Sequence, residues 1–387
     1  MKPLCMLSAV LLASLAWDQA PSAVREEIVY SFPSYVISND KLELAVAARG
    51  GAMLRLLLQG DPEKLSPFGN PEKLTLNPAP PHPPELVGHF VCVDGFGPVS
   101  PEERKAGLSD HGEAHVTPWQ VASSGKQGVA TALKFTVTLP VTQEIFTRTF
   151  TLVDGESVVY VDSELESLLG FDRPVNWAEH ATIAAPFLEP EKNFVDLSSA
   201  RSKTRAYAGG ADAARHRLAS FQDFTWPMAP AKGGGPAIDL RGVPASPDSV
   251  DHTATLYDPS QRLAFVTAVN PARQYLLGYI LRSAEYPWIQ LWMSYNANGW
   301  LERGLEFATQ PFDVPRRETV TTGTMFDTPL FRWLPAKSKI TTRFAMFYAK
   351  TPAGMSKIDD VRLEGGKIIV EDRAAGRQVA LAASLPL

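Results

Sequence analysis

Short runs in which apolar and polar side chains alternate recur along the chain and predict β-strands. Residues 41–46 alternate, and residues 53–58 form a second apolar run. Gly50 and Gly51 lie between these runs, which is typical of a hairpin with a glycine-containing turn. The period of two recurs in two later segments: Phe146, Phe150 and Leu152, then Phe344, Met346 and Tyr348. Residues 363–368 predict one more hairpin around a Gly-Gly pair.

Two proline-rich segments interrupt the strand pattern. Residues 78–84 carry proline at five positions, and residues 226–236 are rich in proline and glycine. Proline has no backbone donor and cannot lie inside a sheet, so both segments are predicted to be loops. Strand patterns resume on both sides of each loop, and capped helical periodicity is hard to find. The pattern therefore predicts an all-β sandwich in a single domain over residues 24–387.

The N-terminus has the pattern of a secretory signal peptide. Lys2 supplies a positive start, residues 4–15 are mostly apolar, and small residues occupy positions 14 and 16. An apolar run of this length is too short to span a bilayer comfortably. We expect residues 1–23 to be a signal peptide and leader, and the mature chain to be exported, periplasmic or secreted. Later apolar runs are short or broken by charge, so no membrane partner is expected after cleavage.

Charge and cysteine content narrow the function further. The 387 residues carry a net charge of −5 and show no basic stripe, which argues against a nucleic-acid partner. Cys5 lies in the predicted signal peptide, so Cys92 remains alone in the mature chain. Because Cys92 lies between Val91 and Val93, we expect a buried small hydrophobic residue rather than a nucleophile. The oligomeric state is not indicated.

Widely separated histidines and carboxylates are the candidate chemistry. His111, His180 and Glu306 could together move protons at a sugar's anomeric carbon. Glu113 and His115 alternate with His111, so on a strand all three would share one face. They would then either bind zinc or line a sugar cleft. Three further histidines are expected to be exposed and have no assigned role: His82, His89 and His216.

Four segments, in order, resemble the aldose 1-epimerase (galactose mutarotase-like) family. The first is an opening hairpin of residues 39–44 followed by Gly50-Gly51-Ala52. The second is His111-Gly112 with Trp119. The third is residues 176–180 followed by Pro186-Phe187. The fourth is residues 289–292, then Gly304-Leu305-Glu306 and Pro311. The resemblance covers most of the mature chain and implies a β-supersandwich with an open cleft across one sheet face.

The resemblance also implies a division of roles for interconverting the anomers of a free sugar. Glu306 would be the general base on the C1 hydroxyl, and His180 the general acid on the ring oxygen. His111 would hold and polarise that oxygen. No metal or cofactor is required, because the anomeric carbon is already a masked aldehyde. The substrate-binding candidates are Asp251, Trp119, Glu113, His115 and Trp292, with Asp223 and Asp239 as rivals of Asp251. Glu302 is the local rival of Glu306.

The chain departs from the family pattern in two places. Neither Arg104 nor Lys105 lies in the Asn-Arg context expected upstream of the first histidine, and no Phe-Ala-Arg follows His111-Gly112. Without that arginine a phosphate clamp is missing, which disfavours a hexose 6-phosphate substrate. Two other functions stay open. One is a non-catalytic carbohydrate-binding protein, and the other is a glycan-cleaving enzyme that pairs Glu306 with Glu113 or Glu179. The sugar's identity and chain length are also open.

Overall fold

The computed structural model describes residues 24–69, 87–207 and 213–387. The predicted signal peptide, the proline-rich segment 78–84 and His82 lie outside the described residues.

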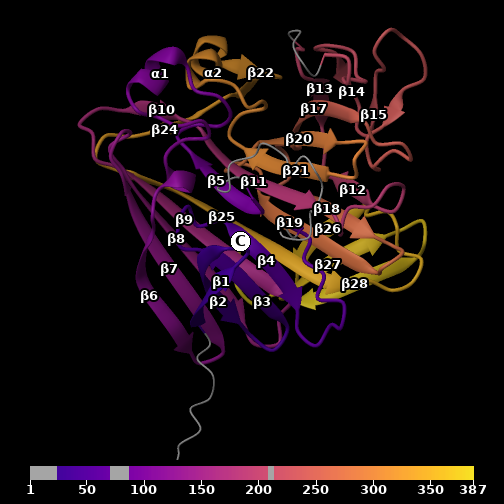
Figure 1. The fold of residues 1–387 in the computed structure, drawn as a ribbon, viewed down its shortest axis with the longest axis horizontal. Helices are drawn as coiled ribbons and strands as arrows, with labels where there is room; N and C mark the ends of the chain where they lie inside the picture. Colours follow the sequence, from indigo (N-terminus) through magenta and orange to yellow (C-terminus); the bar gives the residue numbers. More distant parts are fainter. Residues whose placement is uncertain (1–23, 70–86, 208–212) are drawn as a thin grey trace, which may run out of the picture.

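An eleven-stranded antiparallel sheet forms the larger of two layers (Figure 1). Its β3–β4 hairpin, with Gly50 and Gly51 in the turn, confirms the first predicted hairpin. In spatial order the strands are β1 (Val24–Val29), β2 (Phe32–Ser38), β3 (Leu42–Ala47), β4 (Met53–Leu58), β5 (His89–Val93), β11 (Trp177–Ala184), β21 (Leu301–Ala308), β20 (Trp288–Tyr295), β17 (Ser249–Leu256), β13 (Arg201–Thr204) and β14 (Asp223–Phe224).

The second layer is an eight-stranded antiparallel sheet. It contains the two later segments of alternating pattern, in β8 and β25. In spatial order its strands are β12 (Phe194–Leu197), β18 (Leu263–Asn270), β19 (Tyr275–Arg282), β25 (Lys339–Lys350), β9 (Val158–Ser167), β8 (Glu144–Val153), β7 (Ala130–Leu139) and β6 (Gln120–Gln127).

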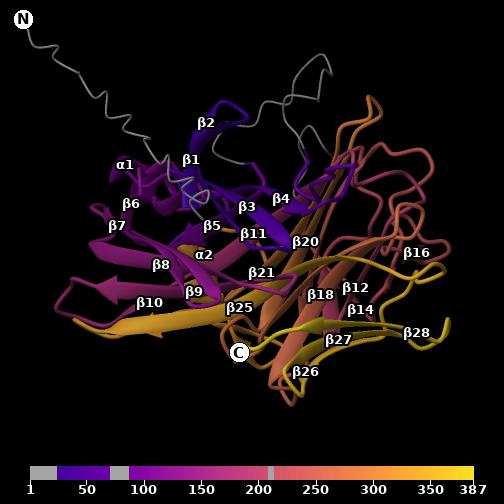
Figure 2. The same cartoon turned by 90° about the horizontal axis from the view of Figure 1, so that it is seen from below.

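A three-stranded sheet at the C-terminus covers part of the outer face of the eight-stranded sheet (Figure 2). It consists of β26 (Asp360–Glu364), β27 (Lys367–Asp372) and β28 (Arg377–Ala382), and its first turn confirms the predicted late hairpin. Short two-stranded pairs complete the strands: β10 (Arg173–Val175) with β24 (Arg332–Leu334), β15 (Met228–Ala229) with β16 (Ile238–Asp239), and β22 (Thr324–Met325) with β23 (Thr328–Pro329).

Helices are short in the described part of the chain: α1 (Pro101–Lys105), α2 (Arg316–Thr322) and a 3-10 turn, η2 (Ala114–Val116). A helix with the length and apolarity needed to cross a bilayer does not occur among the residues that the structure describes. The predicted all-β sandwich is thus confirmed. The loop predicted at residues 226–236 is also found, and it contains β15.

The main core lies between the two large sheets, and strand periodicity explains its composition. Leu305 and Phe307 of β21 face Phe344 and Met346 of β25 there. Successive side chains of a strand point to opposite faces, so every second residue enters this core. Because the C-terminal sheet buries part of the outer face of β25 as well, Phe347 packs into a second apolar cluster.

One carboxylate, Glu179 of β11, links the two large sheets through the core. Glu179 accepts hydrogen bonds from Arg148 Nη2 at 2.5 Å, Tyr286 Oη at 2.9 Å and Trp177 Nε1 at 3.2 Å. Its other oxygen lies 3.1 Å from His89 Nε2. Burial alone would raise the pKa of Glu179, but Arg148 and His89 outweigh burial and the pKa lies below its ordinary value.

The surroundings of two histidines differ from the sequence prediction. His89 was predicted to be exposed but is fully buried. It packs against Phe344 and lies 3.3 Å from the Tyr279 hydroxyl as well as beside Glu179. The prediction was wrong because the neighbouring prolines and charges do not indicate which strand face a histidine occupies. His216 is partly buried and stacks on Tyr207 at 3.8 Å between ring centroids.

Replacing Arg148 with methionine should destabilise the protein by about 3–5 kcal/mol, because the buried carboxylate of Glu179 would lose the one full positive charge among its described contacts. Urea unfolding followed by circular dichroism measures the effect. Lys339→Met is the matched control, because Lys339 forms an exposed ion pair with Glu164 and its loss should cost about 0–1 kcal/mol. Equal costs for the two variants would contradict a sheet-linking role for the buried pair.

Candidate active site

Strand register aligns four polar and aromatic side chains in one row across the eleven-stranded sheet. Phe90 of β5 pairs with His180 of β11, His180 pairs with Glu306 of β21, and Glu306 pairs with Gln290 of β20. Paired residues of neighbouring strands point to the same face. Since Glu179 faces the core, its neighbour His180 faces away from the core, and the whole row does so with it.

A second row, two residues further along each strand, opens a hollow beside the first. It contains Thr182, Gly304, Trp292 and His252 in register. At Gly304 an added Cβ atom would lie 2.0 Å from Glu306 Oε1, so the glycine leaves room for that carboxylate. The resulting pocket has a volume of about 230 Å³ and is lined by Phe90, His111, His180, His252, Gln290, Trp292, Glu302, Glu306 and Asp313.

Glu306 is the most deeply buried acid of the pocket. Its Oε2 accepts a hydrogen bond from Gln290 Nε2 at 2.5 Å, and its Oε1 lies 3.1 Å from His180 Nε2. Burial raises the pKa of Glu306 to about 8, although the Gln290 hydrogen bond and the Arg205 charge act in the opposite direction. A carboxyl group with this pKa can both hold and release a proton near neutral pH.

His180 is held on both sides. Its ring stacks on Phe90 at 4.3 Å, its Nδ1 lies 3.0 Å from Thr182 Oγ1, and its Nε2 lies 3.1 Å from Glu306 Oε1. Burial, with a contribution from His111, keeps the pKa of His180 well below its ordinary value. The ring is therefore neutral at neutral pH.

His111 enters the pocket from a loop rather than from a strand. Its backbone has φ 64°, and its ring meets His180 edge to face at 5.4 Å. The backbone N–H of Gly97 donates to His111 Nδ1 at 3.2 Å. A backbone N–H can only donate, so Nδ1 accepts and the proton of the neutral ring resides on Nε2. Burial and the nearby His115 lower the pKa of His111 to about 3, so the ring stays neutral.

The rim of the pocket is closed by Asp313, which follows β21. Gln290 connects it to the first row, because its Oε1 accepts from the Asp313 backbone N–H at 3.0 Å while its Nε2 donates to Glu306. Arg205 forms an ion pair with the Asp313 carboxylate and donates to its backbone oxygen at 3.0 Å. His252 lies on the same side, and burial and Arg205 keep the pKa of His252 well below its ordinary value.

Four of the predicted site residues meet in this pocket: Glu306, His180, His111 and Trp292. The structure places the other four outside its lining. Asp251 points to the opposite face of β17, where it accepts hydrogen bonds from Arg217 N at 2.9 Å and Arg217 Nε at 2.6 Å. The adjacent His252 faces the pocket instead.

Residues 111–115 do not form the strand on which His111, Glu113 and His115 would share one face. His111 has a left-handed backbone, and η2 begins at Ala114, so the three polar side chains do not share a face. Glu113 accepts hydrogen bonds from the turn between β7 and β8. His115 is buried beside Phe90. Within the described ranges, no group of three or more metal-ligating side chains is placed to hold an ion, so the zinc alternative has no supporting geometry.

Trp119 and Cys92 both lie in the interior of the protein. Trp119, predicted to bind sugar, is buried in the core against Phe135 and Phe146 and donates to the Ala114 carbonyl at 2.9 Å. Cys92 is fully buried, as predicted, and burial raises the pKa of its thiol well above the ordinary value. Its Sγ lies 3.5 Å from His111 Nδ1, although the two residues are 19 positions apart in the sequence.

Sequence reasoning missed four lining residues, Phe90, His252, Gln290 and Asp313, whereas it had weighed Glu302 as a rival of Glu306. Gln290 could have been found, because it lies two positions from the predicted residue Trp292 on the same strand. Asp313 lies in a loop, and no period indicates its direction.

Comparisons with known proteins support the fold. No protein-family model matches the chain, and no curated protein sequence matches it. Among solved structures, a protein provisionally described as an aldose 1-epimerase from Klebsiella pneumoniae is similar at a TM-score of 0.56 and 14% identity, over 84% of this chain and 83% of that one.

Two further solved structures are similar over almost their whole length. A galactose mutarotase-like protein from Clostridium acetobutylicum has a TM-score of 0.55 at 12% identity, over 85% of this chain and 99% of that one. A galactose mutarotase related enzyme from Lactobacillus acidophilus has a TM-score of 0.53 at 10% identity, over 84% and 99%. Identities this low establish the architecture only. The chain therefore has the galactose mutarotase-like β-sandwich fold.

Proposed function

We propose that this protein is an aldose 1-epimerase that interconverts the α and β anomers of a free sugar. The observation that carries the proposal is the approach of His180 Nε2 to within 3.1 Å of Glu306 Oε1 at the floor of a pocket that His111 closes. A donor and an acceptor at this spacing can serve the C1 hydroxyl and the ring oxygen of one pyranose. Trp292 offers an aromatic face to the sugar ring.

The chemistry needs one proton to leave and one to arrive. The base takes the proton of the C1 hydroxyl, the C1–O1 bond becomes a carbonyl, and the C1–O5 bond breaks as the acid protonates O5. The open-chain aldehyde rotates about C1–C2. The ring then closes as O5 attacks the other carbonyl face, the acid takes its proton back from the O5 hydroxyl, and the base returns its proton to O1. His111 Nε2–H donates a hydrogen bond to O5 and stabilises the charge that develops there.

The predicted roles, Glu306 as base and His180 as acid, require one proton in the pair. At neutral pH the empty pocket holds that proton on Glu306, because its pKa is raised while that of His180 is lowered. Moving the proton to His180 creates an ion pair with the same net charge. The sugar hydroxyls, which replace water as hydrogen-bonding partners, favour this form in our proposal.

The lining also favours a free sugar over a sugar phosphate. Among the described residues that line the pocket, three are carboxylic acids and none is lysine or arginine. A phosphate group would lack a cationic partner and would meet the Glu302 and Asp313 carboxylates. An exported chain, as we propose this one to be, would encounter free sugars.

Two alternatives fit the geometry less well. For glycan cleavage the predicted second carboxylates were Glu113 and Glu179, but Glu179 faces the core and Glu113 is bound to the β7–β8 turn. Asp313 lines the pocket but is ion-paired with Arg205. A non-catalytic sugar-binding protein would not need a carboxyl group and an imidazole 3.1 Å apart with oppositely shifted pKa values, and an activity assay separates it from an epimerase.

Polarimetry of freshly dissolved α-D-glucose or α-D-galactose tests the proposal. Wild-type protein should accelerate the decay of optical rotation, and Glu306→Gln and His180→Asn should each lower kcat by about 10²–10⁴-fold, because each removes general acid–base catalysis. Glu164→Gln, an exposed acid on β9, is the control and should retain full activity. Sugar binding without any acceleration by the wild type, across common monosaccharides, would refute the epimerase.

The activity should fall as pH rises past about 8. Above the raised pKa of Glu306 the pair loses its one proton and no acid remains to protonate the ring oxygen.

The free energy of unfolding should depend on pH through the same group, and with the same sign. A raised carboxyl pKa stabilises the folded state fully below the unfolded value, and this contribution is lost as pH rises through the folded value. The free energy of unfolding of wild type should therefore fall relative to that of Glu306→Gln between pH 5 and 9, measured by urea denaturation. A parallel pH dependence of the two proteins would contradict the raised pKa.

Gly304→Ala should abolish most activity while the protein stays folded. The new methyl group would meet the Glu306 carboxylate and displace it from His180, and a misplacement of about 1 Å costs on the order of 100-fold in rate. Steady-state polarimetry gives kcat, and circular dichroism verifies folding. Gly299→Ala changes a glycine whose Cβ would meet no atom within 4 Å, so it controls for glycine replacement although its own φ is positive. Retention of full kcat in Gly304→Ala would show that Glu306 does not act from the position described.

A further inference from the structure

We propose that Glu113 and Asp94 are positioning residues that fix the ring of His111 by fastening both ends of one loop to the same turn. The loop is residues 94–113, called here the His111 loop, and the turn is residues 140–143 between β7 and β8. Neither acid touches the pocket. The inference concerns how His111 is held, and only its kinetic consequence rests on the proposed function.

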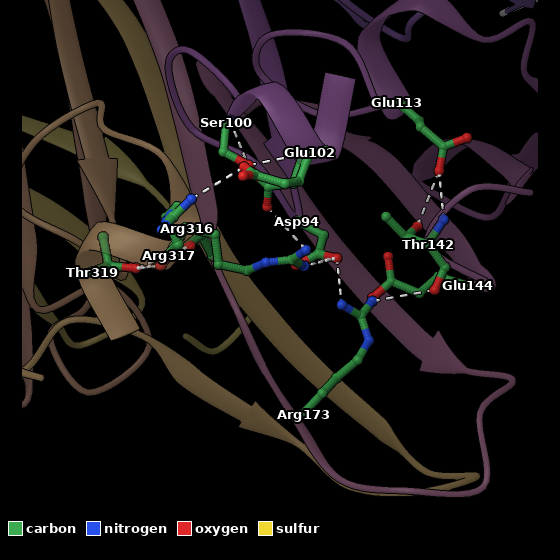
Figure 3. A network of polar contacts seen from close by, with 12 residues as sticks. Asp94, Ser100, Glu102, Glu113, Thr142, Glu144, Arg173, Arg316, Arg317 and Thr319 are labelled. Atoms are coloured by element: carbon green, nitrogen blue, oxygen red, sulfur yellow. Dashed lines mark hydrogen bonds and ion pairs between the residues drawn. The ribbon is translucent and has the colours of Figure 1, made fainter. Parts of the chain in front are cut away.

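The first end of the loop is fastened through Asp94. This carboxylate is fully buried and accepts hydrogen bonds from Arg173 Nη1 at 2.5 Å and Arg316 Nη1 at 2.6 Å (Figure 3). Arg173 in turn donates to the Thr142 carbonyl at 3.3 Å and forms an ion pair with Glu144. The arginine thereby ties the start of the loop to the β7–β8 turn.

The other end is fastened to the same turn through Glu113. Its carboxylate is buried and accepts hydrogen bonds from Val141 N at 3.0 Å, Thr142 N at 2.8 Å and Thr142 Oγ1 at 3.2 Å. Figure 3 shows Glu113 reaching Thr142 beside the Arg173–Glu144 pair. An ionised carboxylate accepts at both oxygens, so each oxygen of Glu113 can receive a backbone N–H group, whereas the NH2 group of an amide would face one of these donors with another donor.

Between these anchors the loop closes on itself around His111. Gly97 contacts His111 twice: its N–H donates to Nδ1 at 3.2 Å, and its carbonyl accepts from the His111 N–H at 2.8 Å. Gly97 has φ 86°, and an added Cβ atom would lie 2.5 Å from the backbone of Asp313. Gly112, with φ 85°, forms an isolated parallel bridge with Val93, and an added Cβ atom would lie 2.1 Å from the Val93 carbonyl oxygen. The ring position therefore depends on both loop ends staying in place.

The hydrogen bond from Gly97 is what selects the His111 tautomer with its proton on Nε2. If Glu113 releases the end of the loop, residue 111 can move away from Gly97, and the ring loses the donor that keeps Nδ1 unprotonated. The Nε2–H group would then no longer point permanently into the pocket. Glu113 thus acts on the pocket through His111, although its own side chain lies elsewhere.

Nuclear magnetic resonance of protein labelled with ¹⁵N-histidine tests this directly. Two-bond proton–nitrogen correlations distinguish the two neutral tautomers, and the His111→Gln variant assigns the signals. In wild type we expect His111 to remain a single neutral Nε2–H tautomer from pH 5 to 8. Glu113→Gln and Asp94→Asn should each convert it to a mixture of tautomers or raise its pKa into this range.

Two further variants keep the test sharp. Asp372→Asn is the matched control, because Asp372 is a buried carboxylate that accepts three backbone N–H groups at 2.9–3.0 Å in the C-terminal sheet, remote from the His111 loop. It should lose stability and leave the His111 signals unchanged.

Thr142→Val removes only the hydroxyl donor to Glu113 and should change the His111 signals in the same direction but less, so it tests the proposal even if Glu113→Gln fails to fold. Unchanged His111 signals in Glu113→Gln and Thr142→Val, or equal changes in Asp372→Asn, would overturn the proposal.

The kinetic consequence is a split between kcat and KM. Glu113→Gln should lower kcat on the order of tenfold to 100-fold with a smaller change in KM, because a misplaced His111 weakens stabilisation of the transition state more than sugar binding. If wild type shows no epimerase activity, the proposed function fails while the tautomer measurement still decides the positioning role. If wild type is active and the tautomer does not respond, only the positioning role fails.

Discussion

The two-residue period of β11 is the constraint on which the rest of the structure depends. Glu179 and His180 are neighbours in sequence, yet one closes an ion pair between the sheets and the other forms the floor of the pocket. The buried ion pair with Arg148 keeps the core face of β11 in place against the eight-stranded sheet. Because the period of a strand is fixed, the same constraint directs His180 to the pocket and into register with Glu306.

Burial has one common effect on every titratable group of the pocket whose pKa is shifted. It lowers the pKa values of His111, His180 and His252, and it raises that of Glu306. In each case the neutral form gains, so these four groups bring little charge to the empty pocket beside the Asp313–Arg205 pair. Hydrogen bonds to a sugar are stronger in such a low-dielectric space than in water. Four neutral hydrogen-bonding groups beside an aromatic ring suit a neutral, hydroxyl-rich ligand.

Sequence periodicity predicted the fold, while the family resemblance supplied the site candidates, four of which the structure brings into one pocket. Glu306 and Trp292 lie on regular strands, where alternation with apolar neighbours separates core-facing from pocket-facing positions. Asp251 was chosen for its resemblance to the family's sugar-binding aspartate, but the register with Trp292 places His252, and not Asp251, on the pocket face. Glu113 and His115 were misplaced because the left-handed backbone at His111 breaks the period at the start of the segment. Asp94 and Arg316 are 222 positions apart, so no local pattern could connect them.

The adjacency of Glu179 and His180 also restricts how the chain length can vary. Inserting or deleting a single residue in β11 ahead of this pair would exchange the faces of both side chains. The imidazole would then enter the core opposite Arg148, and the carboxylate would enter the pocket opposite Glu306. Fold and pocket would be lost in one step, although the amino-acid composition would hardly change. Length differences that preserve this protein must therefore lie in the connections between strands, and the strands of the pocket floor must keep their residue count.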